Sequence, residues 1–161
     1  MAENQEQKTP NIAIRIEAQY IKDLSFEAPK MPQLLAQLKQ APSIGMTVNV
    51  NAAPIDEKKN QFAVELTLKA EAKLEKETAF IFELVYGAVA TVEAPAEHIQ
   101  PLVLIEVPHL IFPYARAIMS NITRDAGLPS LSLNPIDFAS LYRQRLAQAQ
   151  EQAKAKPETK V

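Results

Sequence analysis

One stretch, Glu77–Glu93 (ETAFIFELVYGAVATVE), constrains the fold most, because apolar residues occupy both of its alternating faces. A half-buried strand needs an apolar side chain only at every second position. On the odd-numbered face, the apolar residues Ile81 and Val85 flank Glu83. Because these apolar residues would otherwise face water, we expect something to cover this face as well. The stretch predicts one long strand with a bend or bulge at Gly87. Its even-numbered residues predict a core-facing or subunit-facing surface: Phe80, Phe82, Leu84, Tyr86, Ala88, Ala90 and Val92.

Three earlier segments also alternate apolar and polar residues, which predicts strands at 12–26, 46–52 and 62–74. In the first segment, Ile14, Ile16, Ala18, Tyr20, Leu24 and Phe26 are expected to share one face, and only Ile21 and Lys22 break the alternation. Between the first two strands, residues 33–40 predict at most two helical turns on a crossover, because Pro32 and Pro42 enclose them.

After the fourth strand the apolar spacing lengthens to three or four residues, which predicts helices. One helix is expected to open at Pro95 and to be interrupted at Pro108, and a longer one to cover residues 109–126. A last helix is expected to have Asn134 as its cap and Pro135 at its first position. Strands followed by helices indicate an α+β fold.

The length of 161 residues predicts a single domain, for which we expect residues 12–147. Residues 1–11 are polar, lack the apolar core of a secretory signal and predict a disordered N-terminus. Residues 148–161 lose their apolar anchors and predict a mobile C-terminal tail.

The charge and composition narrow the class of function. The net charge of -2 removes the basic surplus that nucleic-acid binders carry, so a basic protein partner is the better expectation. The chain has no Cys, which fits a reducing compartment. No apolar run reaches the about 18 residues of a membrane span. We expect a cytoplasmic protein that does not insert into a membrane.

The residues that usually perform catalysis are sparse. The chain has three glycines in total and contains neither G-x-G-x-x-G nor a P-loop, so a dedicated phosphate-binding loop is not expected. His98 and His109 have no His or Cys at metal-ligand spacing. The serines Ser120, Ser130 and Ser132 lack the setting of an activated nucleophile. The sequence predicts no enzyme, no metal and no cofactor.

Four segments, in this order and at these intervals, resemble the SecB family of bacterial protein-export chaperones. They are YIKDLSFEAP (Tyr20–Pro29), ETAFIFEL (Glu77–Leu84), LIFPYAR (Leu110–Arg116) and LPSLSLNPIDF (Leu128–Phe138), and the resemblance covers about residues 12–146. It implies a four-stranded antiparallel sheet with helices packed on one face, assembled as a homotetramer, a dimer of dimers.

The resemblance also implies a function. Members of the family hold unfolded precursor proteins in the cytoplasm, keep them competent for translocation and deliver them to the motor SecA. The zinc-binding tail of the motor docks on the outer face of the sheet in that family. The matching positions here are Asp23, Glu27, Ile81 and Glu83, which all have odd numbers and share a face if the strands pair in register.

We expect the unfolded client to bind beside the crossover, because a groove for many sequences needs apolar and adaptable walls. The helix after Pro108 is expected to form the facing wall. Gln40 and Ala41 stand where many members of the family have an aromatic residue before a proline, which implies a less aromatic groove. The expected groove residues are Phe26, Met31, Leu34, Leu35, Leu38, Ile111 and Phe112.

Two other classes of function stay open at this point. Residues 101–107 and 110–115 are apolar nearly all round, which is more than one small sheet can cover. A homo-oligomeric scaffold or adaptor would use this apolar surplus only for self-assembly and would have no affinity for unfolded chains. A small hydrolase or isomerase with an unrecognised site is the third hypothesis. Suppression of the aggregation of an unrelated denatured protein separates the first two classes.

Overall fold

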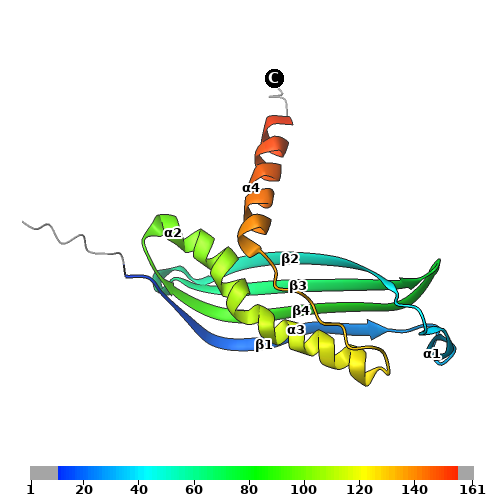
Figure 1. Cartoon of the computed structure of the whole chain (residues 1–161). Helices are drawn as coiled ribbons and strands as arrows, with labels where there is room; N and C mark the ends of the chain where they lie inside the picture. Colours follow the sequence, from blue (N-terminus) through cyan, green and yellow to red (C-terminus); the bar gives the residue numbers. More distant parts are fainter. Residues whose placement is uncertain (1–10, 156–161) are drawn as a thin grey trace, which may run out of the picture.

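The computed structural model describes residues 11–155 and contains one four-stranded antiparallel sheet (Figure 1). The strands are β1 (Ala13–Glu27), β2 (Ser43–Asp56), β3 (Gln61–Leu74) and β4 (Glu77–Glu93), and their order across the sheet is β1-β4-β3-β2. The α+β fold with an antiparallel sheet is therefore confirmed, and β4 has the bounds that its sequence pattern predicts.

The core lies on the side of the sheet that carries the even-numbered residues of β4. Leu84 and Phe82 are each 0% exposed and Tyr86 is 8% exposed, so one chain buries all three of them. The cover is a long helical stretch that crosses this face (Figure 1). It consists of α2 (Ala96–Pro101), a π-helical segment η2 (Leu102–Glu106) and α3 (Val107–Asp125).

The helical stretch is continuous, so the predicted interruption at Pro108 is wrong. Pro108 is the second residue of α3, which follows η2 directly, and it is buried. A proline removes one backbone donor and its ring crowds the preceding turn, so a helix must widen or bend there. The wider hydrogen-bond spacing of η2 is the local adjustment that such crowding favours.

The pairing of β1 with β4 changes register twice, between Ile16 and Ala18 and between Ile21 and Asp23. Each extra residue reverses which side chains face the core. Between the two bulges Tyr20 therefore lies on the outer face, opposite Gly87, whereas Ile21 faces the helices opposite Tyr86. The predicted core-facing positions of Ala18 and Tyr20 are wrong for this reason.

Gly87 itself does not mark a bulge, because the pairing of β3 with β4 runs without interruption through Glu65 and Gly87. Tyr20 explains the glycine instead. A Cβ atom at residue 87 would meet the Tyr20 hydroxyl oxygen at 2.7 Å. The aromatic ring thus occupies the space above the glycine and covers its backbone.

The crossover from β1 to β2 carries one short helix, α1 (Leu34–Gln37), at one end of the sheet (Figure 1). A tight turn with the 3-10 helix η1 (Glu57–Lys59) joins β2 to β3, and Asn60 ends it in the left-handed conformation with a φ of 48°. The crossover agrees with its sequence pattern, which predicts at most two helical turns at residues 33–40.

An extended segment, residues 128–137, connects α3 to the last helix, α4 (Phe138–Ala155). Asp137 caps α4, because its Oδ1 atom accepts the Ser140 amide at 2.9 Å. The prediction of Asn134 as the cap is wrong. The helix continues through residues 148–155 and projects away from the sheet (Figure 1). The mobility of the tail stays a prediction, and residues 1–10 and 156–161 lie outside the described residues.

Candidate functional site

The outer face of the sheet, opposite the helices, carries the four residues assigned to the motor contact. The register places Glu27 opposite Ile81 and Ser25 opposite Glu83, while Asp23 lies opposite Val85 on the same pair of strands. The second bulge of β1 lies just before Asp23 and restores the odd-numbered face. The tertiary structure therefore brings the four residues onto one side of neighbouring strands.

Ile81 is the apolar centre of this surface and is 40% exposed. A shallow recess of about 400 Å³ lies beside it, between Ile81 and Glu83 on β4, Lys69 and Glu71 on β3, and the start of β2. Gly45 contributes to the hollow, because a Cβ atom there would contact only the carbonyl oxygen of Glu71, at 3.9 Å.

Ion pairs modify the charge of the outer face. Lys69 Nζ lies 2.9 Å from Glu83 Oε1, and both side chains remain partly exposed. Lys22, the residue at the second bulge, donates to Glu65, and this hydrogen bond and the charge of Glu65 raise the pKa of the lysine. Within residues 11–155, neither Asp23 nor Glu27 forms an ion pair, so both carboxylates are available to a cationic partner.

The seven residues assigned to the client groove do not all lie at the surface. Ile111 is 0% exposed and Phe112 is 5% exposed, because both point from α3 into the core. Leu34 of α1 is 2% exposed. Leu35 is exposed, and three further residues are half-buried against the core: Phe26, Met31 and Leu38.

The structure does contain an apolar groove at the crossover, and we call it the crossover groove. Its volume is about 310 Å³. Its walls are the end of the crossover, the start of β2, the start of β4 and the segment after α3. The lining residues are Leu38, Gln40, Ala41, Pro42, Ile44, Ala79, Phe80, Leu128, Pro129, Ser130 and Leu131.

Of the residues assigned from the sequence, only Leu38 lines the crossover groove directly. Phe26 lies behind it, because its ring stacks on Phe80 with the ring centroids 5.6 Å apart. Ile44, 39% exposed, was missed although its segment follows Pro42 directly. The sequence feature that indicates the wall after α3 is LPSLSL at residues 128–133. Its apolar residues do not follow a helical spacing, although the segment lies between two helices.

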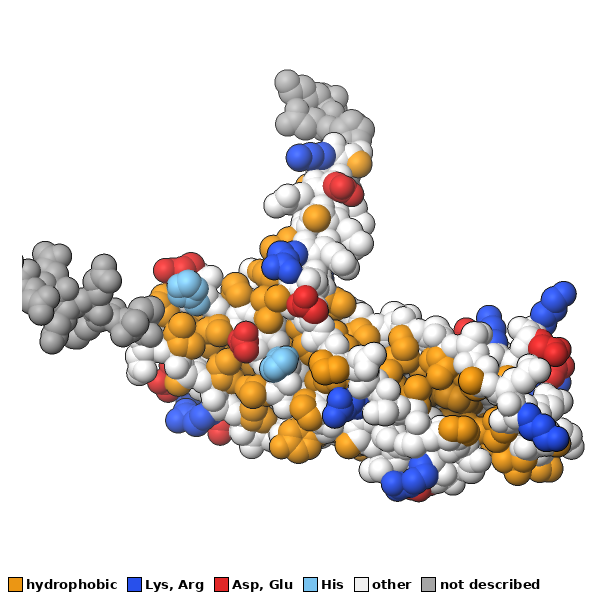
Figure 2. All heavy atoms as spheres, in the orientation of Figure 1, with side chains coloured by type: hydrophobic (Ala, Val, Ile, Leu, Met, Phe, Trp, Pro, Cys, Tyr) orange, Lys and Arg blue, Asp and Glu red, His pale blue; other side chains and the backbone are white. Residues whose placement is uncertain are grey.

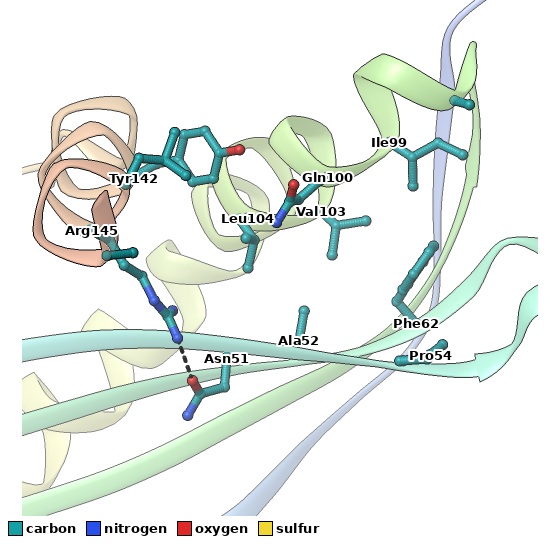
Figure 3. Close-up of a pocket in the computed structure, with 13 residues that line it drawn as sticks. Asn51, Ala52, Pro54, Phe62, Ile99, Gln100, Val103, Leu104, Tyr142 and Arg145 are labelled. Atoms are coloured by element: carbon teal, nitrogen blue, oxygen red, sulfur yellow. Dashed lines mark hydrogen bonds between the residues drawn. The ribbon is translucent and has the colours of Figure 1, made fainter. Parts of the chain in front are cut away.

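A second cleft of about 570 Å³ lies between the end of the β2–β3 hairpin, α2 and α4 (Figure 3). Ala52 and Phe62 line it from the sheet and Val103 from the facing helical stretch, while Tyr142 and Arg145 enter from α4. Arg145 donates to the carbonyl oxygen of Val50 and to Asn51 Oδ1, the latter at 3.3 Å. This arginine therefore fastens the first half of α4 to the edge strand β2.

Hydrophobic side chains also gather on the surface over α2 and α3 (Figure 2). Leu110 is 46% exposed and Tyr114 is 55% exposed, both on α3. By length and composition the stretch Ala96–Asp125 could also span a membrane, but its buried residues pack on the sheet. His98 and His109 are exposed, and no group of potential metal ligands occurs in residues 11–155.

Comparisons with known proteins give matches over most of the chain. The family model described as "Preprotein translocase subunit SecB" matches residues 5–149. The chain is 49% identical over 140 residues to the protein-export protein SecB of Rhodospirillum rubrum, with 87% of this chain and 86% of the relative covered. It is 46% identical over 145 residues to the protein of that name in Mesorhizobium japonicum, covering 89% of this chain and 86% of the relative.

A solved structure has the same fold. It is the SecB-like chaperone of Mycobacterium tuberculosis in complex with a peptide from an antitoxin. The TM-score is 0.64 at 12% sequence identity, and the match covers 76% of this chain and 90% of that chain.

Proposed function

This chain belongs to the SecB family of protein-export chaperones, and from this premise we propose where it binds its clients and its partners. In this proposal the protein works in the cytoplasm, where it holds unfolded precursor proteins, keeps them competent for translocation and delivers them to SecA. Holding needs no reaction and no cofactor. A protein that binds only the unfolded chain shifts the folding equilibrium of its client by mass action.

The crossover groove is the client site in this proposal, and its lining is the observation that carries it. Ile44, Leu128 and Leu131 offer branched apolar side chains, and among residues 11–155 no titratable side chain lines the groove. Apolar contact has little directionality, so such a lining accepts many sequences. Each apolar client side chain that it buries contributes about 1.5 to 3 kcal/mol before ordering costs.

One such groove is too small to hold a precursor tightly by itself. Several grooves on one assembly raise the overall affinity, because binding of a second segment of the same chain becomes intramolecular. A homotetramer built as a dimer of dimers supplies these copies. The exposed Leu110 and Tyr114 on α3 support an interface with a second copy, since clustered apolar residues favour association.

The outer face is the site for SecA in this proposal. Asp23, Glu27 and Glu83 surround the apolar Ile81 and suit a basic partner with one apolar anchor. This face lies on the other side of the sheet from the helices, so a client and the motor can be bound at the same time.

The experiment that tests the client site measures how well full-length variants suppress the aggregation of a chemically denatured, unrelated protein. Ile44→Ser should weaken suppression, because a serine at the groove removes apolar contact area. Ile55→Ser is the matched control, since Ile55 is 53% exposed but lies at the opposite end of β2. Leu34 is unsuitable, because at 2% exposure its replacement would disturb the core.

Two outcomes would contradict the proposal. Equal suppression by Ile44→Ser and Ile55→Ser would move the client site away from the crossover groove. Absence of any suppression by the unmodified protein would favour the scaffold or adaptor class.

A further inference from the structure

One wall of the crossover groove consists of residues 128–131, which follow α3 after a two-residue turn. We call this segment the strap. It belongs to no helix or strand, so hydrogen bonds from neighbouring elements must decide where its side chains lie. Those bonds converge on one residue, Thr123, in the last turns of α3.

The backbone of Thr123 holds the first residue of the strap. Its carbonyl oxygen accepts the Leu128 amide at 3.1 Å, and the neighbouring Arg124 carbonyl accepts the Gly127 amide at 3.0 Å. Gly127 has a φ of 80°, a conformation that glycine adopts without strain. These two bonds and the left-handed glycine form a Schellman motif, which turns the chain sharply at the end of the helix.

The side chain of Thr123 holds the last residue of the strap. Its Oγ1 atom accepts the Leu131 amide at 2.9 Å. The hydroxyl proton points back into α3, where the carbonyl oxygens of Met119 and Ser120 lie 3.0 Å and 3.1 Å away. Thr123 is 0% exposed, so water cannot replace the hydroxyl as the partner of the Leu131 amide.

The hydroxyls of Ser120 and Ser130 form a second contact between α3 and the strap. Ser130 Oγ lies 2.6 Å from Ser120 Oγ and 2.9 Å from the Ser120 carbonyl oxygen. Ser120, Thr123 and Ser130 therefore fasten the middle and the end of the strap to the same turn of α3.

From this arrangement we propose that Thr123 is a positioning residue of the client site, which fixes the strap so that Leu128 and Leu131 form the groove wall. The inference rests on the proposed role of the crossover groove. It adds that client affinity depends on a buried hydroxyl that the client does not touch. Without this hydroxyl the Leu131 amide would have lost its hydrogen-bond partner. The strap would then move out of the groove wall so that this amide could bond to water.

The test compares two substitutions at Thr123 in the full-length protein. Thr123→Val keeps the shape of the side chain and removes the hydroxyl, whereas Thr123→Ser keeps the hydroxyl. The probe is a fluorescent, unstructured peptide rich in leucine and phenylalanine, and its dissociation constant is measured by anisotropy. Thr123→Val should raise the dissociation constant about tenfold. Thr123→Ser should leave it within about twofold of the value for the unmodified protein.

A general loss of folding stability would also weaken peptide binding. Val92→Ala therefore serves as a control for stability. Val92 is 0% exposed and lies near the opposite end of β4 from Phe80. Its truncation destabilises the core without contact to the strap. Hydrogen exchange at residues 128–133 should become faster in Thr123→Val and should stay unchanged in Val92→Ala.

The outcomes separate this inference from the proposed client site. If Ile44→Ser weakens peptide binding and Thr123→Val does not, the positioning role is overturned and the groove stands. If Val92→Ala weakens binding as much as Thr123→Val at equal loss of stability, the positioning role is also overturned. If none of these variants changes the affinity, the location of the client site is wrong.

Discussion

The ring of Tyr20 lies over Gly87 on the outer face of the sheet, and the two residues are direct partners in the pairing of β1 with β4. The contact exists because two bulges in β1 turn Tyr20 outwards. Lys22 at the second bulge reaches Glu65, which lies opposite Gly87 on β3. Gly87 thus leaves room for side chains from β1 beside the proposed SecA site.

The first prediction concerns this contact. Gly87→Ala should lower the free energy of unfolding by about 1 to 3 kcal/mol, because the new Cβ atom would overlap the Tyr20 ring. The cost should shrink when Tyr20 is also replaced by alanine, and urea unfolding of the single and double variants measures this coupling. If the changes in unfolding free energy of the two single variants simply add up in the double variant, the steric explanation is contradicted.

Gly45→Ala is the control for this experiment. Gly45 also lies in a strand on the outer face, but a Cβ atom there would meet the Glu71 carbonyl oxygen at an ordinary contact distance of 3.9 Å. Alanine reduces the conformational freedom of the unfolded chain, so this variant should be neutral or stabilised by up to about 1 kcal/mol.

The second prediction concerns the proposed SecA contact. Glu83→Lys and Asp23→Lys should each abolish detectable binding of SecA in calorimetry, because they place like charge against a basic partner. For the unmodified protein the affinity should fall as salt rises, since exposed charges are screened beyond about 8 Å at physiological ionic strength.

Glu93→Lys gives the same change in net charge at the far end of β4 and should bind SecA normally. Equal losses in Glu83→Lys and Glu93→Lys would indicate a general effect of net charge. Unchanged binding in Glu83→Lys and Asp23→Lys would place the contact elsewhere.

The third prediction concerns assembly. Sedimentation equilibrium at micromolar concentration should give a mass about four times the chain mass of 17.9 kDa. Tyr114→Arg should reduce this mass, because Tyr114 is 55% exposed and a charge would oppose burial at an interface. A monomer for the unmodified protein would contradict the proposed tetramer.

The fourth prediction concerns the start of α4. The amide and hydroxyl of Ser140 donate to the Asp137 carboxylate at 2.9 Å and 2.7 Å, and these bonds lower the pKa of Asp137 below its ordinary 3.8. A carboxyl whose folded-state pKa is lowered stabilises the fold fully above its unfolded pKa. This contribution should be lost as the pH falls from about 3.8 through the folded pKa.

Nuclear magnetic resonance of the Asp137 side chain measures the shift directly. Asp137→Asn keeps an oxygen for the cap and removes the titration, so its α4 helicity should not change over the same range of pH. A titration of Asp137 at or above 3.8 would contradict the role of the two Ser140 bonds.

The period of apolar residues determined the strands and the class of fold. The even-numbered residues from Phe80 to Val92 are all apolar, and β4 (Glu77–Glu93) contains this whole run. Asp23, Glu27, Ile81 and Glu83 also reached one face as their parity predicted, but for β1 this depended on two bulges that cancel each other. The break in the alternation at Ile21 and Lys22 marked the second bulge in the sequence. It did not reveal that Tyr20 lies on the outer face.

Only the tertiary structure decided where the crossover groove lies. Leu34, Ile111 and Phe112 are as apolar in sequence as Ile44 and Leu131, but α1 and α3 turn the first three into the core. The position of Leu131 depends on the Thr123 hydroxyl, a contact between residues that no periodic pattern connects. A repeating pattern records which face of one element is buried, whereas a groove forms between elements, where packing and single hydrogen bonds determine the surface.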